Sequence, residues 1–360
     1  MKILIYISIG LISLVLLTVI VFLVYSMATE YKPVKEEPLQ PTGIASAKSL
    51  NDSIITLMTW NIGYASMGAE TDFFYDGGKM VRPDKGLNTK YLNSIQQYFR
   101  SSQLPDFILL QEVDKNAKRS YFTDQTEILR SLFAGFSSVF AINYNVHFVP
   151  MPVSKPMGRV LAGMMTFSFV EPATSERVSF PVDYDWPARI FTLKRCFILQ
   201  RFPARNGREL VIINTHNSAF DKGNMRQIQL ETLRQTAIEE FAKGNWVIIG
   251  GDWNMNPPGF DPTKISSVEK TFTIDAGKIP TDFMPVGWKW VFDPEKPTNR
   301  EVITSYEMGK TPTTIIDFFL ISPNVEVIEI SSDYQSFAIS DHHPVHLKAF
   351  LTDFSDGSVR

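Results

Sequence analysis

The stretch from Trp246 to Pro257 constrains the fold of this chain more than any other part of its sequence. It begins with four apolar residues and runs through two glycines into a segment that contains Asp252 and Asn254. The first half is typical of a buried strand and the second half of a tight turn. Asp252 and Asn254 alternate about Trp253, so both oxygen-bearing side chains are expected to leave the strand end on one face. Because α/β proteins bind ligands at strand ends, the stretch is either a polar turn or the edge of a binding site.

Length and composition indicate a globular protein with a mildly acidic body. The chain has 360 residues, of which 44% are hydrophobic and 20% charged, enough for one large domain or two ordinary ones. The formal net charge is −3, and leaving out Lys2, the only charged residue among the first 29, makes the remainder −4. Non-specific binding of nucleic acid usually requires a basic face, so this balance argues against a large footprint of that kind. The charge balance does not exclude a local basic groove.

The N-terminal segment predicts a membrane anchor. Residues 3–29 carry no charge and consist largely of Ile, Leu, Val and Phe. About 20 apolar residues span a bilayer, whereas the apolar part of a secretory signal is only about 7–15 residues long. We therefore expect an uncleaved transmembrane helix within residues 1–29 and a single-pass membrane protein. A cleavable signal peptide is the alternative, because Ser26-Met27-Ala28 supplies small residues.

The side of the membrane on which the body lies is predicted by analogy. Lys2 precedes the apolar run, whereas Lys32 and Lys35 follow it among acidic residues, which count little in the positive-inside rule. By analogy with signal anchors that have short N-termini, we expect the body on the extracytoplasmic side. The single cysteine, Cys196, forbids an internal disulfide bond and is expected to be a small apolar residue within a strand.

Beyond the anchor we expect a linker, one folded domain and a short tail. Residues 30–50 hold three prolines among charged and small residues, which is typical of a linker that carries the body away from the membrane. Residues 51–352 are expected to form the folded domain and residues 353–360 a C-terminal tail. The body is expected to be monomeric.

Apolar patterns predict more strands than helices in the folded domain. We expect helices over residues 88–100, 124–133 and 223–243, with Asn88 as the N-cap of the first. The turn at Asn206-Gly207 predicts a hairpin between the strands 189–202 and 209–215. The stretch 257–310 is expected to build loops over one rim. The other expected strands are 54–60, 107–110, segments of 138–169 that flank a loop at 150–158, 246–249, 288–292, 314–321 and 345–351.

Polar residues recur at the ends or in the interior of these strands. Each has an ordinary explanation, because an Asn or Gln-Glu after a strand is usually a turn and a single His is usually a hydrogen-bonded core residue. Asp317 is harder to explain in this way, since a charge within Ile-Ile-Asp-Phe-Phe-Leu-Ile must be paired or bound. Six such positions in one strand-rich chain point to a functional site. The set comprises Asn61, Glu112, His216, Asp252 with Asn254, Asp317, and Asp341 with His342.

In order along the chain, the segments around these residues resemble the signature blocks of the endonuclease/exonuclease/phosphatase superfamily. The blocks are Thr59-Trp60-Asn61, Leu110-Gln111-Glu112, Asn214-Thr215-His216, Gly251-Asp252-Trp253-Asn254, Ile316-Asp317 and Ser340-Asp341-His342. Their order and spacing together carry the resemblance, which covers residues 51–352 and implies that this domain is catalytic. It implies an α/β fold, a four-layer α/β/β/α sandwich of two mostly antiparallel sheets flanked by helices, with the active site on one rim.

The resemblance implies a metal-dependent hydrolase acting on phosphoester bonds, and the residue types suit that chemistry. Hard oxygen ligands suit Mg²⁺, with Mn²⁺ as the alternative ion. Glu112 is the first expected ligand, with Asn61 beside it. Asp252 is expected to orient or deprotonate the attacking water, and Asn254 to hold water or phosphate. A second metal could bind near Asp252, Asn254 and Asp341, because members of the family differ in whether they bind one metal or two.

Histidines and their carboxylate partners complete the expected site. His216 and His342 are expected to donate to phosphoryl oxygens or to act in acid–base catalysis. Asp317 and Asp341 are expected to orient the histidines and raise their pKa values. Asp341 is expected to pair with His342 through the fold or to bind metal, because adjacent side chains of a strand point apart. Trp253 is expected to pack beneath the site.

The chain departs from the superfamily pattern at Ser168, because Phe169 follows it where an arginine often stands. Arg159 and Arg195 are the candidates to replace that phosphate contact. For each of them a surface charge with no role in catalysis is the alternative.

Three functions are compatible with these expectations. We expect a membrane-anchored phosphodiesterase that acts on a lipid or another small extracytoplasmic phosphoester. A nuclease acting on DNA or RNA is the alternative, and basic and aromatic residues around the rim would mark it. That alternative is supported by Trp253, Trp288, Trp290 and Arg300, although these residues would equally suit contact with lipid. An inert binding scaffold is least favoured, because all six blocks retain their functional residues.

Overall fold

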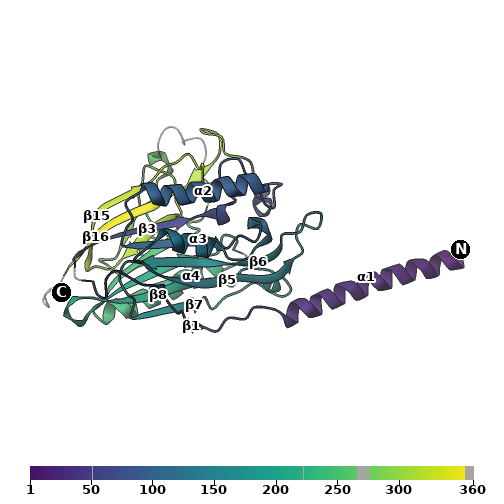
Figure 1. The fold of residues 1–360 in the computed structure, drawn as a ribbon, viewed down its shortest axis with the longest axis horizontal. Coiled ribbons are helices and arrows are strands. Elements are labelled where there is room, and N and C mark those ends of the chain that lie inside the picture. Colours follow the sequence, from purple (N-terminus) through teal and green to yellow (C-terminus); the bar gives the residue numbers. More distant parts are fainter. Residues whose placement is uncertain (51, 222, 266–273, 275, 353–360) are drawn as a thin grey trace.

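The computed structural model describes residues 1–360 except 51, 222, 266–273, 275 and 353–360 (Figure 1). The tail expected at 353–360 therefore lies outside the described residues. The helices are α1 (Lys2–Ala28), α2 (Lys85–Ser101), α3 (Gln125–Leu132) and α4 (Met225–Ala242). The strands are β1 (Glu36–Pro38), β2 (Thr42–Gly43), β3 (Ile54–Asn61), β4 (Phe107–Asp114), β5 (Ser137–Val149), β6 (Gly158–Ser168), β7 (Thr174–Ser179), β8 (Cys196–Pro203), β9 (Glu209–His216), β10 (Trp246–Asp252), β11 (Lys289–Val291), β12 (Asn299–Arg300), β13 (Thr313–Thr314), β14 (Asp317–Ile321), β15 (Val325–Ser332) and β16 (Val345–Leu351).

The described strands form two large sheets and one short ribbon, β12–β13. The first sheet has the order β1-β7-β8-β9-β10-β14-β11, and the second has the order β15-β16-β3-β4-β6-β5-β2. Neighbouring strands are antiparallel except for β9–β10 in the first sheet and β3–β4 in the second. Each sheet therefore carries one parallel pair near its centre, and the four carboxyl ends of these two pairs supply most of the candidate site.

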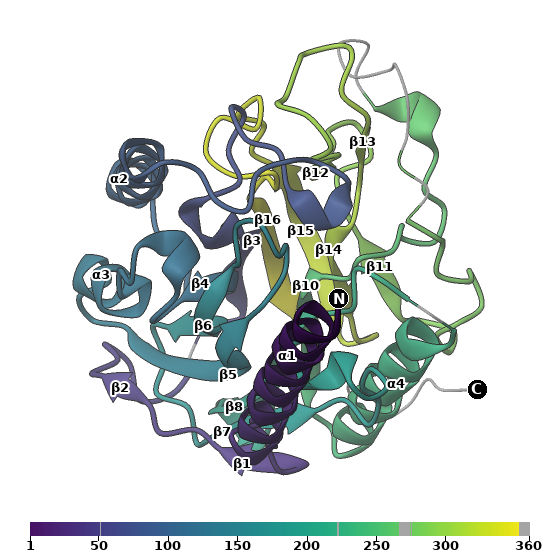
Figure 2. The same cartoon turned by 90° about the vertical axis from the view of Figure 1, so that its right-hand side faces the viewer.

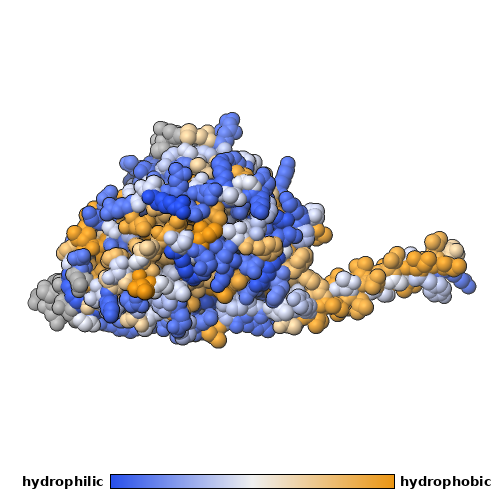
Figure 3. Space-filling view, in the orientation of Figure 1, coloured by the Kyte–Doolittle hydropathy of each residue, from blue (hydrophilic) through white to orange (hydrophobic). Residues whose placement is uncertain are grey.

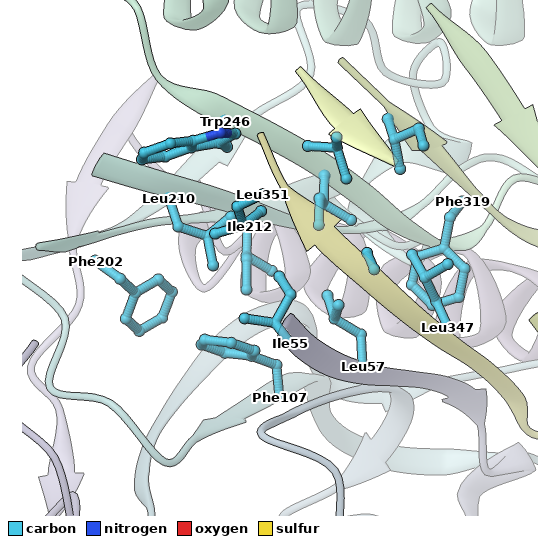
Figure 4. Close-up of a cluster of buried hydrophobic side chains, with 14 of the residues drawn as sticks. Ile55, Leu57, Phe107, Phe202, Leu210, Ile212, Trp246, Phe319, Leu347 and Leu351 are labelled. Carbon is cyan, nitrogen blue, oxygen red and sulfur yellow. The ribbon is translucent and has the colours of Figure 1, made fainter. Parts of the chain in front are cut away.

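The two sheets pack face to face over a buried apolar core (Figure 4). In β3, Ile55 and Leu57 point into this core, whereas Met58 and Trp60 point to the opposite face. Successive side chains of a strand alternate between faces, so a strand covered on both sides has to be apolar almost throughout. Residues from β4, β9, β10 and β16 complete the core, among them Phe107, Leu210, Ile212, Trp246 and Leu347.

Helices cover the outer face of each sheet. Tyr91 and Ile95 of α2 and Leu129 of α3 pack on the outer face of the second sheet. Leu230 and Leu233 of α4 pack on the outer face of the first sheet. The expected four-layer α/β/β/α sandwich is therefore confirmed.

Several element boundaries differ from those expected. The N-cap of α2 is Asp84, whose Oδ1 accepts from the backbone nitrogen of Leu87 at 2.9 Å. Asn88 instead lies inside the helix and donates to the carbonyl oxygen of Ala65 at 2.7 Å. The expected strand 189–202 begins only at Cys196, because residues 188–190 form a short 3₁₀ turn. Strands β7 and β15 were not expected.

The segment between α1 and the body lies against the body. β1 pairs with β7 at the edge of the first sheet, and β2 pairs with β5 at the edge of the second. Leu50 is buried in the core between the sheets. Within residues 30–50, β1 and β2 therefore form one edge strand of each sheet.

The N-terminal helix α1 projects from the body in Figure 1 and is apolar over almost its whole surface. Within the described residues it is the helix that is long and apolar enough to cross a membrane, with a mean hydropathy of 3.0 over its best window. Its place near the N-terminus also suits a signal sequence.

The core between the sheets gives a prediction for stability. We expect Leu57→Ala to lower the free energy of unfolding by about 2–5 kcal/mol, because it leaves a cavity in a fully buried layer. The matched control is Ile54→Ala in the same strand, where the side chain is 47% exposed and a change within about 0.5 kcal/mol is expected. Urea unfolding of both variants measures the difference. Equal effects at the two positions would contradict this description of the core.

Candidate active site

The carboxyl ends of the two parallel strand pairs meet at one rim and are joined across the sheets. Asp252 at the end of β10 lies in register with His216 of β9 on one side and Asp317 of β14 on the other. Its Oδ2 accepts a hydrogen bond from Nδ2 of Asn61, at the end of β3 in the other sheet, at 3.0 Å. Its Oδ1 accepts from the backbone nitrogen of Asn254 at 2.9 Å. Two donors therefore fix the carboxylate of Asp252 at the junction of the sheets.

The glycine before Asp252 is required by the close approach of the neighbouring strand. Gly251 has φ +152°, and a Cβ placed on it would lie 2.0 Å from the carbonyl oxygen of Thr215 in β9. A larger residue would push β10 away from β9, and would thereby move Asp252 relative to His216. The glycine pair recognised in the sequence thus belongs to the architecture of the site.

Glu112 enters the same rim through a bulge in β4. The pairing of β4 with β6 shifts register between Leu110 and Val113, and Glu112 has φ 58°, in the left-handed region. A non-glycine residue in that conformation is strained, and such strain is usually retained where it aims a functional side chain. The carboxylate of Glu112 lies 3.8 Å from Nε2 of His216. Burial, together with the nearby Asp341 carboxylate, raises the pKa of Glu112 to about 8.

His342 is oriented by a hydrogen bond from its Nδ1 to Asp317, and its Nε2 lies beside the side-chain amide of Asn299. Its Nδ1 donates to Oδ2 of Asp317 at 2.8 Å, and its Nε2 lies 3.0 Å from Nδ2 of Asn299. The backbone nitrogens of residues 316 and 317 donate to Oγ1 of Thr298, which fixes the Asp317 end of the pair. Burial opposes a charge on the imidazole, but the carboxylates of Asp317, Asp252 and Asp341 outweigh it and hold the pKa of His342 well above its usual value.

His216 has the opposite electrostatic character. Its Nε2 lies 3.4 Å from Oδ2 of Asp252, and its Nδ1 is buried without a hydrogen-bond partner among the described residues. Burial, reinforced by the positive charges of Arg195 and His342, holds the pKa of His216 well below its usual value. One histidine of the site is therefore neutral and the other is a cation. Their shared neighbour is Asp252, whose Oδ2 lies 3.8 Å from Nε2 of His342.

Asp341 and Asn254 also reach the site. Oδ2 of Asp341 lies 4.0 Å from Nε2 of His342, so it is Asp317, and not Asp341, that orients the histidine. Asn254 has φ 50° and donates from Nδ2 to the carbonyl oxygen of Asn217 at 2.9 Å. All eight residues expected at the site therefore lie at this one rim, with Asp317 behind His342.

A cavity of about 370 Å³ opens above these residues. Its walls contain side chains that the sequence did not single out, notably Tyr64, Arg119 and Arg226. Arg119 is buried against Asp114 at 2.9 Å, and its guanidinium carbon lies 3.2 Å from the ring centroid of Tyr64. Arg226 donates to backbone carbonyls of residues 218, 219 and 276, so it shapes the wall of the cavity.

Arg195 is the cation of the cavity that is best placed for a substrate anion. It lines the cavity, and its Nη1 is buried with no hydrogen-bond partner among the described residues. A buried donor without a partner is costly, so an anionic ligand at this point would satisfy it. Arg159, the other candidate, donates to Oδ1 of Asn145 at 2.9 Å and is not part of the cavity wall.

The residues on which the alternative of a nuclease function rested have structural roles. Trp253 is buried beneath the site and stacks on Phe318, with ring centroids 5.2 Å apart. Trp290 packs on Trp253, and Trp288 on Phe241 of α4. Arg300 is buried and donates to the carbonyl oxygens of residues 67, 68 and 71.

The donor set of the rim suits a hard divalent cation. Glu112 and Asp341 concentrate negative charge in a partly closed cavity, and this repulsion contributes to the raised pKa of Glu112. A bound cation would remove that cost, and carboxylate and amide oxygens are the ligands that Mg²⁺ and Mn²⁺ accept. Atoms of Asp252, Asp317 and His342 also lie within 4.8 Å of one another. Because Asp317 and His342 already bond to each other, the side of the rim that holds Glu112 is the better metal site.

Comparison with known proteins gives a family match. The model of the Endonuclease/Exonuclease/phosphatase family matches residues 58–342, a span that contains all eight site residues. A comparison with curated proteins finds no match.

Solved structures share the fold at low sequence identity. An endonuclease/exonuclease/phosphatase from Beutenbergia cavernae has a TM-score of 0.54 and 16% identity, with 83% of this chain and 72% of that chain covered. The corresponding protein from Bacteroides vulgatus has a TM-score of 0.52 and 14% identity, with coverage of 83% and 100%. ANGEL2, a 2′,3′-cyclic phosphatase solved with adenosine-2′,3′-vanadate, has a TM-score of 0.52 and 13% identity, with coverage of 88% and 99%. These similarities concern the fold alone.

Proposed function

Because the chain belongs to the endonuclease/exonuclease/phosphatase family, we propose that this hydrolase of phosphoester bonds is a membrane-anchored, Mg²⁺-dependent phosphodiesterase. The observation that carries the proposal is the position of Asp252, fixed by Asn61 and Asn254 between a neutral and a cationic histidine. A base beside a hydrogen-bond-donating cation is the arrangement that attack of water on a phosphorus centre requires.

Each residue of the rim has a distinct role in the proposed reaction. Asp252 orients the attacking water and takes its proton, because its carboxylate is fixed and faces the cavity. His342 donates from Nε2 to a phosphoryl oxygen, with Asp317 holding its ring and its charge. His216 stays neutral and contributes a hydrogen bond at the same centre. The new bond joins the water oxygen to phosphorus, the ester bond to the leaving oxygen breaks, and that oxygen takes up a proton.

Glu112 is the proposed principal metal ligand, with Asn61 beside it and Asp341 as a further carboxylate whose charge acts on Glu112. When bound, Mg²⁺ or Mn²⁺ neutralises charge on the phosphoryl oxygens and favours the leaving group. Asp252 and Asn254 complete the oxygen-bearing rim, and would take part in holding a second ion if one binds. The strained backbone at Glu112 supports this assignment, because it turns the carboxylate into the cavity from the interior of a strand.

We also propose the arrangement of the chain relative to the membrane. Residues 1–29 anchor the protein, residues 30–50 connect the anchor to the body, and residues 51–352 form the catalytic domain. The length and hydropathy of α1 support the anchor, and cleavage as a signal sequence is the alternative. We place the catalytic domain on the extracytoplasmic side and expect it to act as a monomer.

A lipid or another small phosphodiester is the preferred substrate over a nucleic acid. The fold neighbour ANGEL2 is named a 2′,3′-cyclic phosphatase, which keeps nucleotide chemistry within reach of this fold. Of the tryptophans that could stack bases, Trp253 is buried in the core cluster on the outer face of the first sheet, and Trp288 and Trp290 are partly buried and pack against that cluster. The mildly acidic body also argues against an extended nucleic-acid footprint.

The test is hydrolysis by the purified full-length protein in detergent with Mg²⁺ or Mn²⁺. The panel consists of a phospholipid, DNA, RNA and bis(p-nitrophenyl) phosphate, each assayed with and without EDTA. We expect activity on the chromogenic diester that EDTA abolishes and added Mg²⁺ restores. If all four substrates stay intact and calorimetry detects no metal binding, the proposal is wrong. Activity that survives EDTA would contradict the proposed metal dependence.

Arg195 gives a prediction for substrate binding. We expect Arg195→Gln to lower kcat/KM for the chromogenic diester by about 10–100-fold, because a charge-assisted hydrogen bond to a phosphate oxygen is lost. The matched control is Arg159→Gln at the same end of the molecule, whose side chain bonds to Asn145 outside the cavity and should leave kcat/KM unchanged. Steady-state kinetics of both variants measure the difference. Similar losses in the two would show that Arg195 has no special contact with substrate.

A further inference from the structure

The anchor helix packs against the same rim that carries the candidate active site. β5 runs in the same direction as β3, because β3 is parallel to β4 and two antiparallel steps through β6 connect β4 to β5. The end of β5 therefore lies at the rim of Asn61 and Glu112. The ring of Phe22 in α1 packs on Phe148 of β5, with centroids 6.0 Å apart, and Tyr25 packs on His147.

A second contact joins the anchor to the wall of the cavity. Phe22 stacks on Phe191 with centroids 5.7 Å apart, and the following residues Leu193 and Arg195 line the cavity. Glu30, immediately after the helix, pairs with Lys194 at 3.2 Å, and its side chain is only 5% exposed. One segment, residues 191–195, thus contacts the base of the helix and lines the cavity.

The length of α1 sets the depth of these contacts in a bilayer. The helix has 27 residues, and at about 1.5 Å per residue the stretch from Lys2 to Val21 spans about 30 Å, the thickness of the hydrocarbon core. The remainder, from Phe22 to Ala28, covers about 10 Å and corresponds to the headgroup layer. Body residues that touch Phe22 therefore lie at the depth of the headgroups.

The rim beside the anchor exposes apolar side chains where a soluble surface would be polar. At the tip of the β5–β6 hairpin, Met151 and Val153 are 49% and 80% exposed, with the cationic Lys155 beside them. Trp186 is exposed on the segment that leads to Phe191, and Phe220 is exposed at the cavity wall. Figure 2 faces this end of the molecule, with α1 directed toward the viewer, and Figure 3 shows apolar surface on the body beside the base of α1. Exposed aromatic and aliphatic groups with a nearby cation are typical of surfaces that lie on a membrane.

We propose that the cavity opens onto the bilayer that holds α1, and that the substrate is the phosphodiester headgroup of a membrane phospholipid. The inference rests on the proposed phosphodiesterase function and on α1 acting as a membrane anchor. Arg195 receives the phosphate, while Phe220 and Ile303, both exposed at the cavity, contact the apolar part of the lipid. Water adds its hydroxyl to phosphorus and its proton to the leaving oxygen. A phosphomonoester and an alcohol result, and one of them stays in the bilayer.

The first test compares two substrates of one preparation. The full-length protein is reconstituted into vesicles of phosphatidylcholine and phosphatidylglycerol with Mg²⁺, and lipid products are followed by mass spectrometry beside hydrolysis of bis(p-nitrophenyl) phosphate. We expect both substrates to be cleaved. Cleavage of the soluble diester with intact lipid would overturn the lipid assignment and leave the proposed function standing. If neither is cleaved, the proposed function itself fails.

The second test changes the membrane-facing hairpin. We expect Met151→Ser combined with Val153→Ser to lower lipid hydrolysis by about tenfold, because less apolar surface enters the headgroup layer, while hydrolysis of the soluble diester is unchanged. The control is Val286→Ser, which replaces a fully exposed residue at the opposite end of the molecule and should change neither rate. Its neighbour Gly287 packs beside Pro323, beyond the far end of β14. Unchanged lipid hydrolysis in the hairpin variant, or equal loss of both activities, would contradict the proposed contact.

A direct measurement of depth completes the design. The native Cys196 is buried, so Val153→Cys and Val286→Cys each supply one accessible thiol for a polarity-sensitive fluorophore. In vesicles we expect the probe at position 153 to shift to the blue and to be quenched by spin-labelled lipid, whereas the probe at position 286 stays in water. Identical spectra at the two positions would show that the rim does not face the bilayer.

Discussion

Replacing Asp252 with asparagine is expected to lower kcat for phosphodiester hydrolysis by about a thousandfold, the loss typical of removing a positioned general base. The amide keeps the size of the side chain, but its single oxygen can keep only one of the two hydrogen bonds that Asp252 accepts, from Nδ2 of Asn61 and from the backbone nitrogen of Asn254. It carries no negative charge, so it takes no proton from water. The cationic charge on His342 also loses one of the carboxylates that stabilise it.

A matched variant separates this effect from damage to the fold. Asp106 immediately precedes β4 at the opposite end of the sheet, where its Oδ2 accepts from the backbone nitrogen and the hydroxyl of Thr56, each at 2.8 Å. We expect Asp106→Asn to lower the free energy of unfolding by about 1 kcal/mol and to leave kcat unchanged. Circular dichroism and steady-state kinetics on both variants give the comparison. If Asp252→Asn keeps the wild-type kcat at saturating Mg²⁺, Asp252 does not activate the water.

The site could be predicted from the sequence where polar residues interrupt apolar strands. Asn61, His216 and Asp252 each end a strand that is buried on both faces, so their polarity has no explanation in packing. Asp317 is a charge within an apolar run of the sequence and is the first residue of β14, and its partner is a site residue, His342. These signals are local, and they follow from the cost of burying a polar group without a partner.

The walls of the cavity could not be predicted in the same way, because their residues come from turns and a helix end and not from the ends of apolar strands. Tyr64 lies in a turn with φ 55°, and Arg226 starts a helix whose sequence gives no sign of a site. Arg119 is a partial exception, since the charge of Asp114 at the end of β4 requires a buried cation nearby. A search for that partner would have found Arg119 in the sequence.

Among the strands that were not predicted, β15 and β7 were missed for different physical reasons. β15 alternates Val and Glu at first, but a register shift between Val327 and Glu329 interrupts the alternation that identifies a strand. β7 is polar, and its Arg177 is buried, with donors to the carbonyl oxygens of Ile142 and Lys194. No propensity rule favours a buried arginine in a strand, so only the tertiary structure explains this element.

Replacing Asp317 with asparagine is expected to lower kcat by about a hundredfold near neutral pH, with a larger loss at alkaline pH. The amide can still accept from Nδ1 of His342, so the ring keeps a partner where Asp317 now holds it at 2.8 Å. The negative charge is lost, and burial, which opposes the imidazolium, is then less well balanced by Asp252 and Asp341. The pKa of His342 therefore falls in the variant.

The sign of the pH effect follows from which form of His342 is active. The proposed donor is the protonated imidazolium, which persists in the wild type because its pKa is raised well above the usual value. Activity that depends on it is present below that pKa and is lost as pH rises through it. A lower pKa in the Asp317→Asn variant moves the alkaline limb of the kcat profile to lower pH.

If the role of Asp317 were only structural, the alkaline limb of the kcat profile would stay at the same pH in Asp317→Asn. A variant of a second buried carboxylate tests that alternative. Glu240 is buried and pairs with Arg201 at 2.8 Å, in the last turn of α4 and away from the rim. We expect Glu240→Gln to lower the thermal midpoint without moving either limb of the profile, because it changes no charge near His342. The measurement is the pH dependence of kcat for Asp317→Asn and Glu240→Gln at saturating Mg²⁺. An alkaline limb that stays fixed in Asp317→Asn would mean that His342 does not act as the charged donor, and the neutral His216 would then be the better candidate for that contact.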